Sequence, residues 1–179
     1  MRFLLPILAL TLFLAGCATP PAPVKSPPSG RTAGRKCLTV RTTAYTHTEP
    51  GGRNNAIGTR LRFGGATYSA ASDWSWMPLG TRFYMPCTER TYVIEDYGSA
   101  LVGRKTIDLY MPTRKLMNHW GMRHVDIEIL EWGSKIMSLK MLEPRQRNAH
   151  VRTMVAELRK QVPRGGADLA LARATAPAP

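Results

Sequence analysis

The chain has 179 residues and a formal net charge of +13 at neutral pH, because 25 lysines and arginines face 12 aspartates and glutamates. Once terminal segments are set aside, this length holds one domain of ordinary size. Such a basic balance favours an anionic polymer as partner, but the sequence has no recognised nucleic-acid-binding motif. We therefore expect no nucleic acid to bind.

The chain begins with the pattern of a secretory signal peptide over residues 1–16, which read MRFLLPILALTLFLAG. The apolar run is too short to cross a membrane comfortably. Residues 14–17, Leu-Ala-Gly-Cys, resemble a bacterial lipobox, in which Cys17 is lipid-modified. The alternative is an ordinary cleaved signal before an incidental cysteine. Because Ala18 stands where an inner-membrane retention signal usually has Asp, we expect an outer-membrane lipoprotein that faces the periplasm.

Residues 17–36 are rich in Pro, Ala, Ser and Gly and contain no large apolar cluster. Such a segment cannot bury enough apolar surface to offset the conformational entropy of ordering it. We expect a flexible tether between the lipid and the folded domain.

The remaining cysteines are Cys37 and Cys87. An even pair in an exported protein predicts a disulfide, with two free thiols as the alternative. The 4 histidines show no recognised ligand spacing, so the sequence predicts neither a metal site nor a cofactor.

Short segments rich in β-branched and aromatic residues predict six strands. A glycine-rich stretch over 47–65 separates the first two, and we expect it to form a long loop at the rim of the functional site. The predicted strands are 38–46, 67–71, 81–85, 92–95, 106–110 and 125–132.

Two segments predict helices. Residues 112–120 form a short one, with Thr113 as its N-cap and Gly121 at its end. Within a helical extension over 134–163, apolar residues at helical spacing predict an amphipathic helix, either packed on the domain or free to bind a partner. Residues 164–179 are expected to be a disordered tail. The apolar positions of the longer helix are Val151, Met154, Val155, Leu158 and Val162.

Three aspartates, Asp73, Asp96 and Asp108, lie within or beside the predicted strands. A strand fixes a side chain better than a loop does, so polar chemistry is expected around them. The alternative is that Asp96 only starts a turn and an arginine pairs with Asp108. Beside Asp73, Trp74 and Trp76 are either sugar-stacking surfaces or core residues, and we expect Trp74 to be the exposed one.

Four motifs resemble the signature of the three-aspartate (3D) domain family. Residues 96–103, DYGSALVG, and 106–110, TIDLY, carry its last two aspartates. The segments TAYT at 43–46 and SAASDWSWMPLGT at 69–81 resemble its first two motifs, in the right order. The resemblance implies a mainly β fold, a six-stranded double-psi β-barrel over 37–133, as in lytic transglycosylases and related wall-acting proteins.

That resemblance implies cleavage of the glycan strands of peptidoglycan. Asp108 matches the group that serves first as acid and then as base, while Asp96 and Asp73 orient it or hold its neighbours. The C6 hydroxyl of the sugar attacks in place of water and leaves a 1,6-anhydro end. The expected substrate contacts are Thr43, Tyr45, Trp74 and Gly98.

Two other functions stay open at this point. Rare-lipoprotein-A-like proteins also have the double-psi barrel, and some of them bind glycan without obvious turnover. The chain is then a non-catalytic peptidoglycan-binding lipoprotein, or a structural tether between outer membrane and cell wall. A fold does not choose between these functions.

Overall fold

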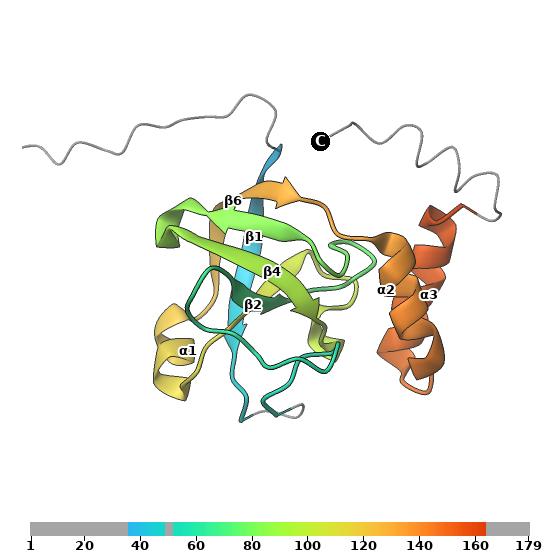
Figure 1. Ribbon diagram of the computed structural model, residues 1–179, viewed down its shortest axis with the longest axis horizontal. Coiled ribbons are helices and arrows are strands. Elements are labelled where there is room, and N and C mark those ends of the chain that lie inside the picture. Colours follow the sequence, from blue (N-terminus) through green and yellow to red (C-terminus); the bar gives the residue numbers. More distant parts are fainter. Residues whose placement is uncertain (1–35, 49–51, 164–179) are drawn as a thin grey trace, which may run out of the picture. The chain divides into compact units, whose positions relative to one another are not determined.

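The computed structural model describes residues 36–48 and 52–163, which belong to one unit, Thr32–Pro179. The expected signal peptide, Cys17, the tether up to residue 35 and the C-terminal tail lie outside the described residues. Six strands close into a barrel in the order β1-β5-β2-β4-β3-β6, which confirms the predicted mainly β fold class (Figure 1). The strands are β1 (Lys36–Tyr45), β2 (Tyr68–Ala71), β3 (Arg82–Met85), β4 (Arg90–Asp96), β5 (Thr106–Tyr110) and β6 (Arg123–Glu131).

Two strand pairs of the barrel are parallel, β1 with β5 and β2 with β4, and the other four are antiparallel. Parallel neighbours require crossover connections, so strands distant in the sequence become neighbours in the wall. In particular, β5 lies between β1 and β2. This arrangement brings the predicted TAYT motif of β1 beside the last aspartate of the signature.

Side-chain alternation along the strands separates the barrel core from its outer face. On β6, Val125, Ile127 and Ile129 are buried as predicted. On β5, Ile107 and Leu109 are fully buried, and Asp108 between them is half-buried. The side chain of Asp108 therefore projects from the barrel wall on the side away from the core.

The short helix α1 (Arg114–Trp120) follows β5 and has the predicted ends. Its N-cap is Thr113, whose hydroxyl accepts a hydrogen bond from the backbone N–H of Leu116, and its C-cap is Gly121 at a φ of 61°. A positive φ is readily available to glycine, which explains the stop at this position.

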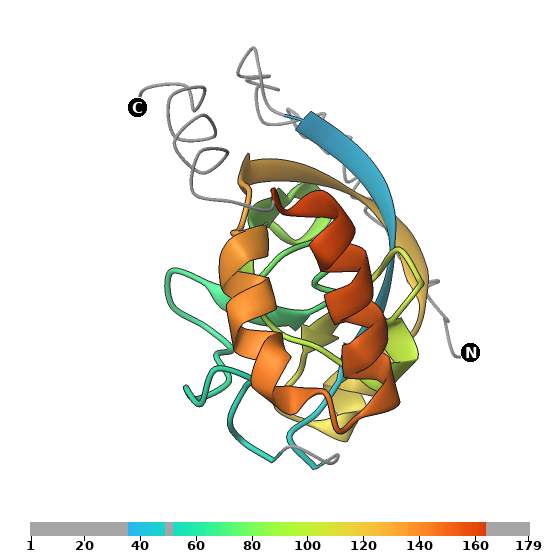
Figure 2. The ribbon, with the colours of Figure 1, turned by 90° about the vertical axis from the view of Figure 1, so that its right-hand side faces the viewer.

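Two further helices, α2 (Lys135–Leu142) and α3 (Ala149–Gln161), form a hairpin beside the barrel (Figures 1 and 2). The buried face of α3 consists of Val151, Met154, Val155 and Leu158, which join the same apolar core as the barrel strands. The amphipathic helix therefore packs on the barrel. Among the described helices, none is long and apolar enough to cross a membrane.

The hairpin is joined to the barrel at Gly133, between β6 and α2. A Cβ atom at this position would clash with the carbonyl oxygen of Leu79, so no other side chain fits. The next residue, Ser134, donates its backbone N–H to that carbonyl and caps α2 by accepting from the N–H of Met137. Close backbone contact thus fixes where the hairpin leaves the barrel.

The predicted disulfide between Cys37 and Cys87 is wrong. Both cysteines are free and exposed. Cys37 lies on β1 opposite Glu128 of β6, and Glu128 pairs in turn with Tyr84 of β3, so β6 separates the two cysteine-bearing segments. Cys37 and Tyr84, which stands three residues before Cys87, are thus two strand spacings or about 10 Å apart, whereas a disulfide spans a Cα separation of about 4.4–6.8 Å.

Candidate functional site

Two of the three signature aspartates flank one residue of β2. Ala71 pairs with Asp108 of β5 on one side and with Asp96 of β4 on the other. Their Cα atoms therefore lie about 10 Å apart, two strand spacings. The register between β2 and β4 shifts at Ala71, so the ladder passes over Glu95. Such irregularities often re-aim a side chain beside an active site.

Asp96 and Asp108 line one cleft with a volume of about 600 Å³. Its walls come from the end of β1, the loop before β2, the β4–β5 loop and the start of α3. Two of the predicted substrate contacts, Tyr45 and Gly98, are among the lining residues. The lining residues are Tyr45, Asn54, Asn55, Ala56, Ala71, Asp96, Tyr97, Gly98, Ser99, Ala100, Leu101, Asp108, Asn148 and His150.

Asp108 is held by the neighbouring strand β1. Thr43 is its register partner, and the Thr43 hydroxyl donates a hydrogen bond of 2.6 Å to Asp108 Oδ1. The two residues come from the first and last motifs of the signature. Thr43 therefore orients the carboxylate at the edge of the cleft.

Several hydrogen bonds hold the carboxylate of Asp96. Its carboxylate accepts from the backbone N–H of Tyr97 at 2.9 Å and from the hydroxyl of Tyr45 at 3.2 Å, and the backbone of Ala56 also hydrogen-bonds it. Burial raises the pKa of Asp96 above its ordinary value, and the three hydrogen bonds oppose the shift. Asp96 is thus a positioned carboxyl that binds a proton more tightly than a solvated one.

The charges of both cleft carboxyls act on the phenol of Tyr45. Burial is the main reason that the pKa of Tyr45 is raised, and the charges of Asp96 and Asp108 raise it further. The phenol therefore stays protonated and acts as a hydrogen-bond donor in the cleft. Its ring packs against Tyr110, with centroids 5.7 Å apart, and Tyr110 OH lies 2.9 Å from Nδ1 of His47.

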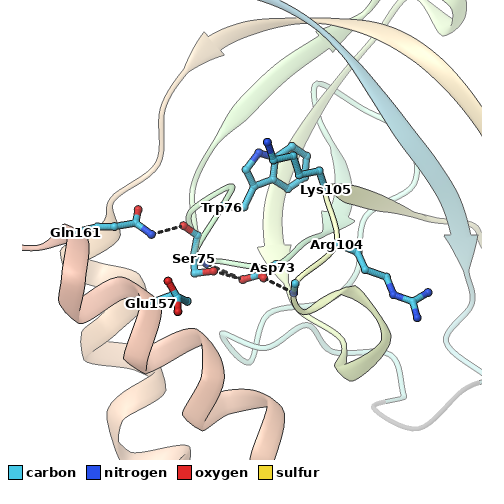
Figure 3. A pocket seen from close by; sticks show the side chains of 8 residues that line it. Asp73, Ser75, Trp76, Arg104, Lys105, Glu157 and Gln161 are labelled. Carbon is cyan, nitrogen blue, oxygen red and sulfur yellow. Dashed lines mark hydrogen bonds between the residues drawn. The ribbon is translucent and has the colours of Figure 1, made fainter.

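The third aspartate, Asp73, lies in a neighbouring cavity of about 360 Å³ instead of the cleft (Figure 3). It is buried, and its carboxylate accepts from both the N–H and the hydroxyl of Ser75. Its other oxygen accepts the backbone N–H of Gly103 at 2.8 Å. Asp73 therefore ties the turn after β2 to the β4–β5 loop, whose first half lines the cleft.

The expectation that Trp74 is exposed for sugar stacking is wrong. Trp74 is fully buried, and its indole N–H donates to the carbonyl of Asp96 at 2.9 Å. Its ring meets the ring of Tyr97 edge to face, with centroids 5.0 Å apart. Because the turn at Asp73 folds inward, Trp74 supports the cleft wall from beneath. Trp76 is half-buried and lines the Asp73 cavity.

The described part of the loop before β2 forms a rim of the cleft, as predicted. Asn55 organises it: its side-chain oxygen accepts from the N–H groups of Ile57 and Thr59. Arg62 fastens the loop to β4 through an ion pair with the buried Glu95. The rim is therefore a hydrogen-bonded structure that presents Asn55 and its neighbours to the cleft.

Sequence reasoning missed the contribution of the helical hairpin to the cleft. Asn148 and His150, at the start of α3, line the cavity together with the two aspartates. Arg145, just before them, donates to the carbonyl of Ala56 in the rim loop at 2.8 Å. An asparagine before an amphipathic helix signals an N-cap, but sequence spacing carries no signal for its place over the cleft.

Comparison with known protein families finds a match within the barrel. Residues 68–131 match the family model of the 3D domain. This segment is similar to the 3D domain. A search of curated proteins found no match to the chain. The 3D family is associated with proteins that act on peptidoglycan, and its match here includes Asp73, Asp96 and Asp108.

Parts of the cleft lie outside the matched 3D segment. On the N-terminal side, β1 completes the barrel and supplies Thr43 and Tyr45. On the C-terminal side, the hairpin supplies Asn148 and His150. The matched segment therefore provides the aspartates, and flanking segments provide much of their surroundings.

Proposed function

We propose that this chain cleaves the glycan strands of peptidoglycan by the lytic transglycosylase reaction. The observation that carries the proposal is the pair of carboxyls, Asp96 and Asp108, on either side of Ala71 in one cleft. Glycoside cleavage uses an acid that protonates the leaving oxygen and a second group that supports the developing positive charge. A cleft with two oriented carboxyls offers both.

In the proposed reaction Asp108 is the acid and then the base. It gives its proton to the glycosidic oxygen as the bond from C1 to that oxygen breaks. The resulting carboxylate then takes the proton of the C6 hydroxyl while O6 bonds to C1, which closes the 1,6-anhydro ring. The proton lost in the first step is regained in the second, and water is not consumed. Thr43 holds the carboxylate of Asp108 through both steps.

Asp96 has a different role in this proposal. Three hydrogen bonds fix its carboxylate, so it is suited to act as a stationary group near the developing positive charge at C1. Tyr45 holds it from the β1 side. Asp73, outside the cleft, acts by keeping the β4–β5 loop in place.

Digestion of purified sacculi by the isolated chain tests this function. Mass analysis of the soluble products should find muropeptides with 1,6-anhydro ends and no reducing-end hydrolysis products. Release of reducing ends would instead indicate a hydrolase. Tight binding to sacculi without any release would indicate the non-catalytic peptidoglycan-binding lipoprotein, and the lytic proposal would then be abandoned.

We also propose that the chain is an outer-membrane lipoprotein held through Cys17. The support is the lipobox-like sequence at 14–17 and the absence of Asp after Cys17. The net positive charge of +13 suits a polymer that bears free peptide carboxylates. In this proposal the tether lets the barrel reach the peptidoglycan from the membrane surface.

A further inference from the structure

The start of α3 is the part of the cleft wall that the matched 3D segment does not contain. His150 lies in the first turn of α3 and is half-buried, and it lines the same cavity as Asp96 and Asp108. The next residue, Val151, is fully buried in the core shared by the helix and the barrel. The helix turn that carries His150 is therefore anchored by packing.

His150 continues a row of aromatic rings that begins in the core. The buried Trp74 meets Tyr97 with ring centroids 5.0 Å apart, and Tyr97 meets His150 with centroids 6.0 Å apart. Tyr97 and His150 both line the cleft, whereas Trp74 does not. The row thus presents two supported rings to whatever occupies the cleft, and flat rings of this kind pack well on the apolar faces of sugars.

Asn148 adds an amide beside these rings. It is the N-cap residue of α3, but no cap hydrogen bond from its side chain occurs among the described residues. An N-cap asparagine ordinarily bonds the first turn of its helix. Here the side chain is exposed and lines the cleft, so its amide is placed to bond a ligand.

The hairpin is also coupled to the rim loop opposite. Arg145 donates to the carbonyl of Ala56, and the backbone of Ala56 in turn hydrogen-bonds Asp96. Hairpin, rim loop and cleft carboxyl are therefore connected through a continuous set of hydrogen bonds. This connection links the hairpin to the part of the cleft wall that holds Asp96.

We propose that His150 and Asn148 bind the glycan strand directly, and that the α2–α3 hairpin is a built part of the substrate-binding cleft. This inference rests on the proposed function, because it takes a strand of N-acetylated sugars as the ligand. His150 packs its ring on one sugar beside Tyr97, and Asn148 hydrogen-bonds a hydroxyl or acetamido group. The 3D aspartates then act on the bond that these residues hold in place.

The test is calorimetric binding of a soluble, peptide-free tetrasaccharide of alternating N-acetylglucosamine and N-acetylmuramic acid to the full chain. His150→Ala and Asn148→Ala should each weaken binding on the order of tenfold, the loss of one stacking or hydrogen-bonding contact. The matched control is His124→Ala, an exposed histidine of β6 that does not line the cleft, which should bind like wild type.

Thermal unfolding of each variant shows that it is folded before its affinity is compared. Binding of His150→Ala and Asn148→Ala equal to that of His124→Ala would overturn the inference, even if the wild type cleaves sacculi. Weakened binding by folded variants supports the inference even if the wild type releases no products, in which case the lytic proposal alone fails. A wild-type chain that does not bind the tetrasaccharide overturns the inference.

Discussion

Asp73 and Asp96 have identical side chains, but their different surroundings give them different roles. Asp73 is buried, and its carboxylate accepts hydrogen bonds from Ser75, in the turn after β2, and from Gly103. Asp96 accepts from Tyr45 and from backbone groups but keeps one side toward the cleft. The first carboxylate is structural, and the second is available to a ligand.

Asp73→Ala should therefore destabilise the domain. The change removes a charged acceptor from the N–H groups of Ser75 and Gly103, and hydrogen bonds to a charged group are worth about 1.5–3 kcal/mol each. We expect the free energy of unfolding to fall by about 2–4 kcal/mol in urea titration. Asp126→Ala, on an exposed aspartate bonded to Thr39, should change it by about 0.5 kcal/mol or less. Equal losses for both variants would contradict the structural role of Asp73.

The raised pKa of Asp96 predicts how stability depends on pH. Since the folded state binds this proton more tightly than the unfolded state, the Asp96 contribution to stability falls as pH rises from about 3.8, the ordinary pKa of an aspartate, through the raised folded pKa. The asparagine of Asp96→Asn cannot ionise, so this variant does not lose that stability as the pH rises. Relative to wild type, the variant should therefore gain stability as the pH rises above about 4.

Urea unfolding of wild type and Asp96→Asn across that pH range measures the difference. The slopes of the unfolding free energy against pH should diverge, with the variant less dependent on pH. Parallel slopes would mean that the Asp96 pKa is the same in the folded and unfolded states.

At the scale of elements, the cleft depends on a small residue in β2. Ala71 is buried between the register partners Asp96 and Asp108 and lines the cavity between them. A leucine there would add bulk to the cleft floor. We expect Ala71→Leu to fold, at a cost of about 1–3 kcal/mol for overpacking, and to lose glycan binding.

Calorimetry with the same tetrasaccharide measures this loss. The matched control is Ala156→Leu, which adds the same atoms to the exposed face of α3 and should bind normally. Undiminished binding by Ala71→Leu would place the glycan elsewhere on the barrel.

The elements predicted from sequence were those with strong local signals. Alternation in β6 and the cap residues Thr113 and Gly121 of α1 are visible in the sequence, and the structure confirms them. The sequence does not predict α2 as a helix of its own. Its apolar residues do not keep to one face, and Ile136 and Met137 are exposed.

The sequence predicts the parts of the site that lie within the motifs. It does not predict the parts that depend on packing between segments far apart in the chain. The resemblance placed both Thr43 and Asp108 at the site, and the structure adds a hydrogen bond between them. Trp74 was misjudged because its direction follows from a turn that only the fold determines. His150 was missed because the packing of α3 on the barrel, rather than any spacing, brings it to the cleft.

In our proposal, the lipid anchor at Cys17 holds the whole molecule, and with it the cleft, at the outer membrane. Cys17→Ser removes the proposed site of lipid attachment. We expect the variant to leave the membrane fraction and appear as soluble protein, or to accumulate as the unprocessed precursor. Fractionation and intact-mass analysis distinguish these states. A variant that is cleaved normally and stays with the membrane would show that Cys17 is not the anchor.

In the proposed reaction Asp108 moves the proton in glycan cleavage, and the rate of an Asp108→Asn variant tests this role. Asp108→Asn keeps the shape of the side chain but cannot deliver and regain a proton. The rate of release of 1,6-anhydro muropeptides from purified sacculi should fall on the order of 10²–10⁴-fold, with folding and sacculus binding unchanged. Asp126→Asn, at an exposed position of β6, should keep the wild-type rate. Release by Asp108→Asn at nearly the wild-type rate would remove Asp108 from the mechanism.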